Sequence, residues 1–139
     1  MTNREASIFA CFADIVVSPE PFLPPVRDTD AVAFFAKWLD LAPKLNAAGL
    51  RAAVAALEMG PLALGYRRRL RKLPRAQRVD YLLALERHRA PPVRQAVKAL
   101  KGIAFLCYYG DDAIMKRLGY DADANVARAR ALRIAEGRP

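Results

Sequence analysis

The spacing of apolar residues predicts three helices in the first half of the chain. Over residues 4–17 they recur at i, i+1, i+4, i+7 and i+8, which is typical of an amphipathic helix. A second helix is expected over residues 30–41, capped from within residues 28–30 and apolar on nearly every side. A third, marked by apolar residues over 50–57, is expected to stop at Gly60-Pro61.

Prolines and glycines divide the rest of the chain. Four prolines within residues 18–25 predict an extended loop, because proline removes a donor and disfavours helix in the residue before it. Pro74 and Pro91-Pro92 each suit the first turn of a helix, and Gly110 is expected to close the second of these in a left-handed cap. The residues expected to face inward after Pro74 are Val79, Leu82, Leu83 and Glu86. Those after Pro92 are Val93, Ala96, Val97, Leu100, Ala104 and Cys107.

The C-terminal residues predict one short helix and one poorly packed helix. Asp111 or Asp112 can cap the short helix, which is expected to end near Gly119. Residues 122–136 are mostly alanine and arginine, and few of their side chains can pack. We expect this last segment to fray or to dock on another surface.

These elements predict an all-α fold. Sustained alternation of apolar and polar residues is missing, so no sheet is expected. We expect residues 1–139 to form a single domain of about six to eight helices, with the proline-rich loop near the N-terminus. Its core should lie within about residues 4–120, and residues 121–139 should form a peripheral C-terminal helix.

Composition narrows the class of protein. A chain of 139 residues, with 54% hydrophobic and 27% charged residues, can bury a real core and is not disordered as a whole. Its formal net charge of +9 implies attraction to an acidic partner protein, to nucleic acid or to an anionic membrane surface.

Cysteines and hydropathy add expectations about the compartment. Cys11 and Cys107 could pair, remain reduced in the core, or link to a partner, and two buried thiols are the favoured interpretation. Neither belongs to a CxxC motif, so the sequence does not support a structural zinc. Because we find neither a membrane-spanning segment nor a leader, we expect a cytoplasmic protein, periplasmic only if it is exported with a partner.

Candidate catalytic residues are few. His88 is the only histidine, which excludes a metal site of several imidazoles, and its position favours an exposed residue at a helix end. The acidic residues of 111–112 and 121–123 precede helical segments, so capping explains them better than metal binding. Recognisable nucleotide-binding and hydrolase motifs are missing. We therefore expect a chain that is not an enzyme on its own and binds no metal or cofactor.

Basic residues are the strongest charge signal. They include the run Arg67 to Arg69, and they continue onto the helix after Pro92. On that helix one face, opposite the inward stripe, is expected to carry Arg94, Lys98, Lys101, Phe105 and Tyr108. A face that passes from cations to aromatic rings suits a phosphate or carboxylate surface, nucleic acid included, although a solvated face remains the commonest use of such charges.

Several motifs in the second half carry a family resemblance. They are Tyr66-x3-Leu70-x2-Leu73-Pro74-x3-Arg78-x2-Tyr81-Leu82-x2-Leu85, Val97-x2-Leu100-Lys101-x7-Tyr108-Tyr109 and Leu118-Gly119-Tyr120. Together with the early segment Phe12-Ala-Asp14-Ile-Val-Val-Ser-Pro19, this pattern resembles the gluconate 2-dehydrogenase subunit 3 family. The members of that family are small subunits of flavin-dependent alcohol and sugar dehydrogenases.

The resemblance implies a non-catalytic helical subunit. Its partner would be a large glucose-methanol-choline-type oxidoreductase that carries FAD, and the small subunit would stabilise that partner. Family members with a twin-arginine leader help to export the complex, but the present sequence departs from them in lacking that leader. No nucleic acid is expected as a partner on this interpretation.

The interface with the large subunit should use exposed aromatic and basic residues. The candidates are Phe34, Phe35, Trp38, Arg67, Arg94, Lys98, Lys101, Phe105, Tyr108, Tyr109 and Tyr120. For the tyrosines, a place in the core is an open alternative. Two other functions also stay open: a basic helical domain that binds nucleic acid or regulates, and a peripheral contact with an anionic membrane that brings a lipophilic substrate to the partner.

Overall fold

The computed structural model describes residues 1–137, and within them it contains helices and no strand. Its seven α-helices and two 3-10 helices (η) are α1 (Asn3–Val17), η1 (Val26–Asp28), α2 (Ala31–Leu41), α3 (Lys44–Ala63), η2 (Leu70–Lys72), α4 (Arg75–Glu86), α5 (Pro91–Tyr109), α6 (Asp112–Arg117) and α7 (Ala122–Ala135). The predicted all-α fold of six to eight helices is confirmed.

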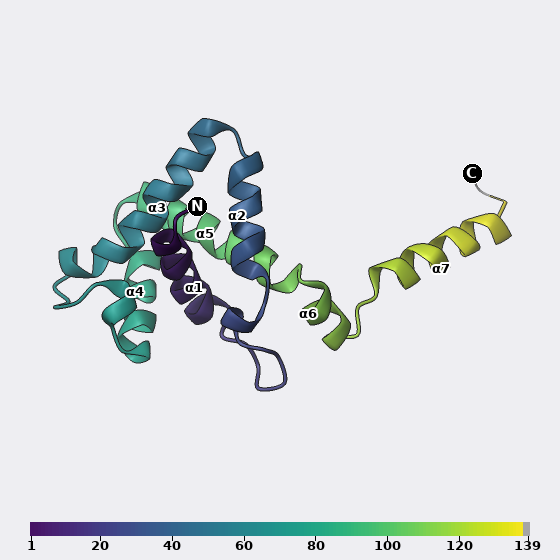
Figure 1. Ribbon diagram of the computed structural model, residues 1–139, viewed down its shortest axis with the longest axis horizontal. Coiled ribbons are helices and arrows are strands. Elements are labelled where there is room, and N and C mark those ends of the chain that lie inside the picture. The colour runs from purple at the N-terminus through teal and green to yellow at the C-terminus, as the bar shows by residue number, and fades with distance from the viewer. Residues whose placement is uncertain (138–139) are drawn as a thin grey trace.

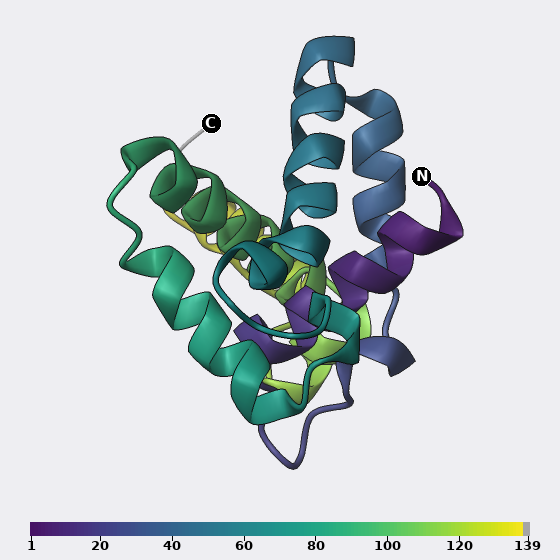
Figure 2. The same cartoon turned by 90° about the vertical axis from the view of Figure 1, so that its left-hand side faces the viewer.

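The core forms where α1 and α5 cross. Figures 1 and 2 show α1 beside α5, with α2, α3 and α4 arranged around them. Beside this crossing α2 packs on α1, and the rings of Phe9 and Phe35 stack there with centroids 3.9 Å apart. Phe12, Tyr81 and Tyr108 complete the large fully buried aromatic set. This burial of apolar surface supplies most of the driving force that holds the helices together.

Local capping explains where several helices begin. Thr2 and Glu5 form a capping box at the start of α1, and the Thr2 hydrogen bonds lower the pKa of the Glu5 carboxyl. The Asp111 carboxylate accepts hydrogen bonds from the backbone N–H groups of Ala113 and Ile114 at the start of α6. Asp121 caps α7 in the same way. The prediction that these two aspartates act as caps is confirmed.

The predicted stop at Gly60-Pro61 is wrong, because α3 continues through Pro61 to Ala63. A proline at this position cannot donate to the carbonyl of Leu57, four residues earlier. The Tyr81 hydroxyl of α4 donates to that carbonyl at 3.3 Å instead. Gly60 makes this possible, since a Cβ there would lie 2.1 Å from the Tyr81 hydroxyl. A neighbouring helix thus replaces the hydrogen bond that proline removes.

Two further local predictions need correction. On α4 the buried face is Tyr81, Leu82 and Leu85, whereas Val79 and Leu83 are exposed. Both stripes have helical spacing and share Leu82, and the contact of α4 with α3 and α5 selects the first. Gly110 has a φ of −80°, so it is not left-handed. A glycine is needed there for space, because a Cβ would lie 2.5 Å from the Leu106 carbonyl oxygen.

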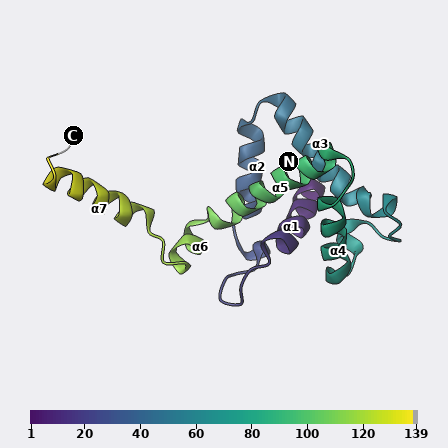
Figure 3. The ribbon, with the colours of Figure 1, turned by 180° about the vertical axis from the view of Figure 1, so that it is seen from behind.

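The last helix stands apart from the others. Figures 1 and 3 show α7 extending away from the remaining helices as an arm that begins after α6. None of its residues is buried. The expectation of a peripheral segment with little to pack against fits this arrangement, and its side chains remain available to another surface. The predicted segment runs to residue 139, and its last two positions, 138–139, lie outside the described residues.

Candidate partner interface

An apolar stripe runs along the outer face of α2. It consists of Phe34 and Trp38, 51% and 42% exposed, followed by Leu41 near the end of the helix, which is 85% exposed. Leu45, in the first turn of α3, is 83% exposed and follows directly across the turn. Figure 1 shows that α2 and α3 meet at a corner that projects beyond the other helices. This set, which we call the α2 stripe, places large apolar side chains in water on a projecting corner.

Phe35 does not belong to that surface. It is fully buried, and its ring stacks on Phe9 of α1. The prediction that it takes part in an interface is therefore corrected: its neighbour Phe34 points outward and Phe35 points inward. Successive residues on a helix lie about 100° apart, so two adjacent phenylalanines cannot both face the same surface.

A second aromatic surface lies on α5. The rings of Phe105 and Tyr109, one turn apart, stack with centroids 6.1 Å apart, and both side chains are partly exposed. Lys98 is exposed on the same side of the helix, and its side chain makes no hydrogen bond or ion pair to the part of the chain described here. Phe105, Tyr109 and Lys98 thus form a small ridge that remains available to a partner.

The other two cations predicted for this face have structural partners. Arg94 donates from Nη1 to the backbone carbonyls of His88 and Arg89, at 2.7 and 3.0 Å, where α4 ends. Lys101 forms an ion pair with Glu86 of α4. Both side chains therefore hold the hairpin of α4 and α5 together. They contribute less free positive charge than the sequence indicated.

Tyr108 is also misplaced by the sequence prediction, because it faces the core and not the basic face. Its side chain is fully buried, and its hydroxyl donates to the Pro24 carbonyl at 2.6 Å. That bond fastens the proline-rich loop to α5. Burial, together with the nearby Tyr109 and Asp111, raises the pKa of the Tyr108 phenol. Of the two open alternatives for this tyrosine, the structure selects the core.

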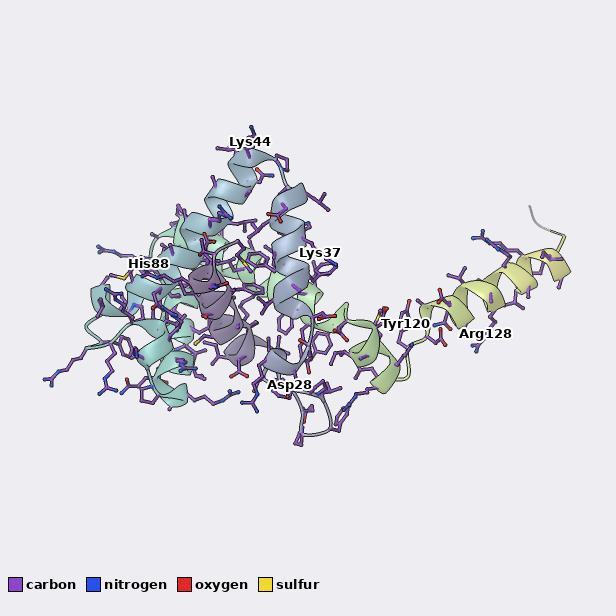
Figure 4. The ribbon with its side chains drawn as sticks, in the orientation of Figure 1. Asp28, Lys37, Lys44, His88, Tyr120 and Arg128 are labelled. Carbon is purple, nitrogen blue, oxygen red and sulfur yellow. The ribbon has the colours of Figure 1, made fainter. Side chains whose placement is uncertain are left out.

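The remaining candidates lie far from the α2 stripe. Arg67 is exposed in the loop between α3 and η2, and Tyr120 is exposed between α6 and α7. Figure 4 shows Tyr120 at the start of the arm, well separated from Lys37 on α2 and farther still from His88. The predicted residues therefore do not converge on one site. They occupy at least three separate surfaces.

Groups with catalytic potential have ordinary structural roles. The His88 Nδ1 accepts a hydrogen bond from the Ala90 backbone N–H, 3.1 Å away, at the turn between α4 and α5. Both cysteines are free thiols. Burial raises the pKa of the Cys107 thiol to about 11, and burial also raises the pKa of the half-buried Cys11 thiol, which lowers the fraction of nucleophilic thiolate at both. Among residues 1–137, no cluster of three or more potential metal ligands occurs.

The leucines of the α2 stripe are absent from the residues predicted for the interface. Leu45 follows the break between α2 and α3, where the helical periodicity is interrupted and does not assign it to a face. Leu41 follows Phe34 and Trp38 at i+7 and i+3, so the continuing helical spacing could have identified it.

Comparisons with known proteins add no assignment. We found no match to any family model, to any curated protein or to any solved structure. Within residues 1–137, none of the helices has both the length and the apolar character that crossing a membrane requires.

Proposed function

We propose that this chain is a non-catalytic helical subunit that binds and stabilises a large partner protein through the α2 stripe. The observation that carries the proposal is the projecting row of Phe34, Trp38, Leu41 and Leu45, all substantially exposed. Contiguous large apolar side chains in water are unfavourable for a free monomer and are typical of surfaces that another protein covers. The absence of a convergent set of reactive groups in residues 1–137 fits a binding role.

The partner that we propose is a large FAD-dependent alcohol or sugar dehydrogenase or oxidase of the glucose-methanol-choline type. Its identity rests on the motif resemblance alone. In such a complex the hydride would pass to FAD within the partner, and the small chain would supply folding support. The formal charge of +9 would speed association with an acidic partner surface.

Purification of the tagged chain from its native host tests both the binding role and the identity of the partner. We expect a co-purifying chain several times larger, and an eluate with the visible absorbance bands of flavin. A large colourless partner would support the binding role and contradict the flavoprotein assignment. An eluate that contains the chain alone, or nucleic acid, would contradict the proposal as a whole.

Matched variants test whether the α2 stripe is the surface used. Phe34→Ser with Trp38→Ser should abolish co-purification, because it removes the aromatic centre of the stripe. The control is Val79→Ser with Leu83→Ser, another exposed apolar pair one turn apart, located on α4. Both double variants should keep the helical circular dichroism of the wild type. Loss of the partner from the α4 variant and not from the α2 variant would show that we have assigned the wrong face.

A further inference from the structure

The basic residues around η2 divide into two groups. The first group has partners inside the protein. Arg71 donates from its backbone N and from Nε to the Glu58 carboxylate, at 3.3 and 3.1 Å, and Arg75 reaches Asp14 at 2.5 Å. Arg78 donates to the backbone carbonyls of Leu73 and Arg71. These three arginines join α4 and η2 to the rest of the fold, and their hydrogen-bonding capacity is in use.

The second group consists of Arg67, Arg68, Arg69 and Lys72. All four are exposed, and their side chains make no hydrogen bond or ion pair to any residue within 1–137. Together with Leu62 they line a surface hollow of about 680 Å³ that has no acidic residue in its wall. We call this hollow the arginine pocket. The loop between α3 and η2, which carries the three arginines, lies at the end of the molecule opposite α7, and Figure 2 presents that end to the viewer.

The backbone beneath the arginine pocket is firmly held. Leu70 and Leu73, on either side of Lys72, are buried. Tyr66 donates its backbone N–H to the Pro61 carbonyl at 3.0 Å, and its ring makes a T-shaped contact with the ring of Tyr81, with centroids 6.2 Å apart. The buried Glu58 anchors Arg71 within the same segment. Because the loop is fixed at both ends, the four cations start from a preorganised backbone, which lowers the entropy cost of binding a ligand.

We propose that the arginine pocket binds a phosphate-bearing ligand with several negative charges, such as a diphosphate or a phosphomonoester. Four cations that share one hollow repel one another, and a dense anion relieves that repulsion at a single point. Guanidinium groups match phosphate oxygens with paired N–H donors, which makes three arginines and a lysine a fitting set for such a group. Carboxylates carry one charge each, so several would have to converge to give the same neutralisation.

The surroundings of the pocket argue against an extended polyanion. Single-stranded nucleic acid uses a long basic groove with aromatic rings on which bases stack. Leu62 is the apolar residue of this pocket, and no aromatic side chain lines it. The basic row of α5, which could have extended such a groove, has Arg94 and Lys101 engaged with α4. The pocket therefore lacks the aromatic rings and the continuous basic groove that a single strand would use.

Calorimetric titration of the full chain with pyrophosphate at low ionic strength tests the proposal. The same titration uses a variant in which Arg67, Arg68 and Arg69 are all replaced by Gln. We expect wild type to bind, and this variant to bind at least about tenfold more weakly, since removing even one charge-assisted hydrogen bond to the ligand costs about that factor. The matched control replaces Arg128, Arg130 and Arg133 of α7 by Gln, removes the same charge from exposed positions, and should bind like wild type.

Two further experiments identify the source of the phosphate and test whether the paired N–H donors of arginine matter beyond their charge. Vesicles that contain a phosphomonoester lipid separate a membrane headgroup from a soluble ligand, and binding to either, abolished in the Gln variant, supports the pocket. Replacement of the same three arginines by Lys keeps the charge and removes the paired donors, so it should weaken binding less than Gln does. Circular dichroism checks that each variant is folded.

Several outcomes would overturn the proposal. They are equal weakening by the α7 control, unchanged affinity in the Gln variant, and binding of a polyglutamate peptide or of duplex DNA in place of both phosphate probes. None of these outcomes tests the α2 stripe, because the titrations and the vesicle experiments contain no large partner. Failure of one proposal is therefore distinguishable from failure of the other.

Discussion

Helices α5 and α7 are both long, with 19 and 14 residues, yet α5 is central to the fold and α7 buries none of its residues. On α5 the buried residues Val97, Leu100, Ala104, Cys107 and Tyr108 recur at helical spacing and form one continuous stripe. On α7 the larger apolar residues Val126, Leu132 and Ile134 fall on different sides of the helix, and none is buried. Helix propensity is therefore sufficient to shape a helix, whereas a continuous apolar stripe is needed to attach it.

The sharpest test within the packed region compares two adjacent phenylalanines. Phe35→Ala should lower the free energy of unfolding by about 4 kcal/mol, because it opens a cavity beside Phe9. Phe34→Ala, at an exposed position, should change it by less than about 0.5 kcal/mol. Chemical denaturation of both variants measures the difference. Similar losses in the two variants would contradict the assignment of Phe34 to a partner surface.

The ion pair between the buried Glu58 and Arg71 tests whether the arginines with internal partners stabilise the segment around η2. Glu58 is 2% exposed and pairs with Arg71. Glu58→Ala leaves Arg71 without its carboxylate and should lower the free energy of unfolding by about 3 kcal/mol. The control is Asp28→Ala, which breaks the exposed ion pair with Arg27 and should cost less than about 1 kcal/mol. A loss no larger than that of the control would show that the loop under the arginine pocket is held by other contacts.

The contact that carries α3 through Pro61 has a smaller expected effect. Tyr81→Phe leaves the Leu57 carbonyl without its donor and should cost about 1 kcal/mol at neutral pH. Tyr66→Phe is the matched control, since the Tyr66 hydroxyl makes no hydrogen bond to the described residues, and it should be nearly neutral. If both variants cost the same, the hydroxyl of Tyr81 does not replace the bond that proline removes.

The same residue predicts a dependence on alkaline pH. The ordinary pKa of the phenol is 10.0, and burial raises the pKa of folded Tyr81 to about 12. The folded state therefore holds this proton more tightly, and its contribution to stability is complete below pH 10 and is lost as the pH rises toward 12. Over that window wild type should lose on average about 1 kcal/mol per pH unit more than Tyr81→Phe, because the limiting slope of about 1.4 kcal/mol applies only to a full difference of one proton. Parallel pH profiles of the two proteins would contradict the burial of this hydroxyl.

The smallest expected effect concerns the arm. Ala129→Pro should break α7 and leave the free energy of unfolding of the remaining helices unchanged, because α7 buries no residue. Ala99→Pro, at an exposed position within α5, should cost about 3 kcal/mol or more. Thermal unfolding followed by circular dichroism compares them. A clear loss of stability in the Ala129 variant would mean that the arm packs on the other helices.

Much of the fold and some of the candidate interface followed from local sequence. Helix positions, the caps at Asp111 and Asp121 and the exposure of the last helix all follow from patterns within a few residues. The aromatic residues predicted for the interface were assigned only partly correctly by the sequence. Phe34, Trp38, Phe105 and Tyr109 are at the surface, whereas Phe35 and Tyr108 are in the core. A helix that is apolar on nearly every side has no single face that its own pattern can assign to the interior.

The sequence by itself determined where the chain is helical, because propensity, proline positions and capping act through neighbouring residues. The tertiary structure decided which face of α2 and α4 is buried, which cations have partners and whether α3 ends at Pro61. Each of those outcomes depends on a side-chain group from another segment of the chain. These groups are the ring of Phe9, the carboxylates of Glu58 and Glu86, and the hydroxyl of Tyr81. Contacts between residues far apart in the chain exist only after the helices have packed, so local periodicity cannot specify them.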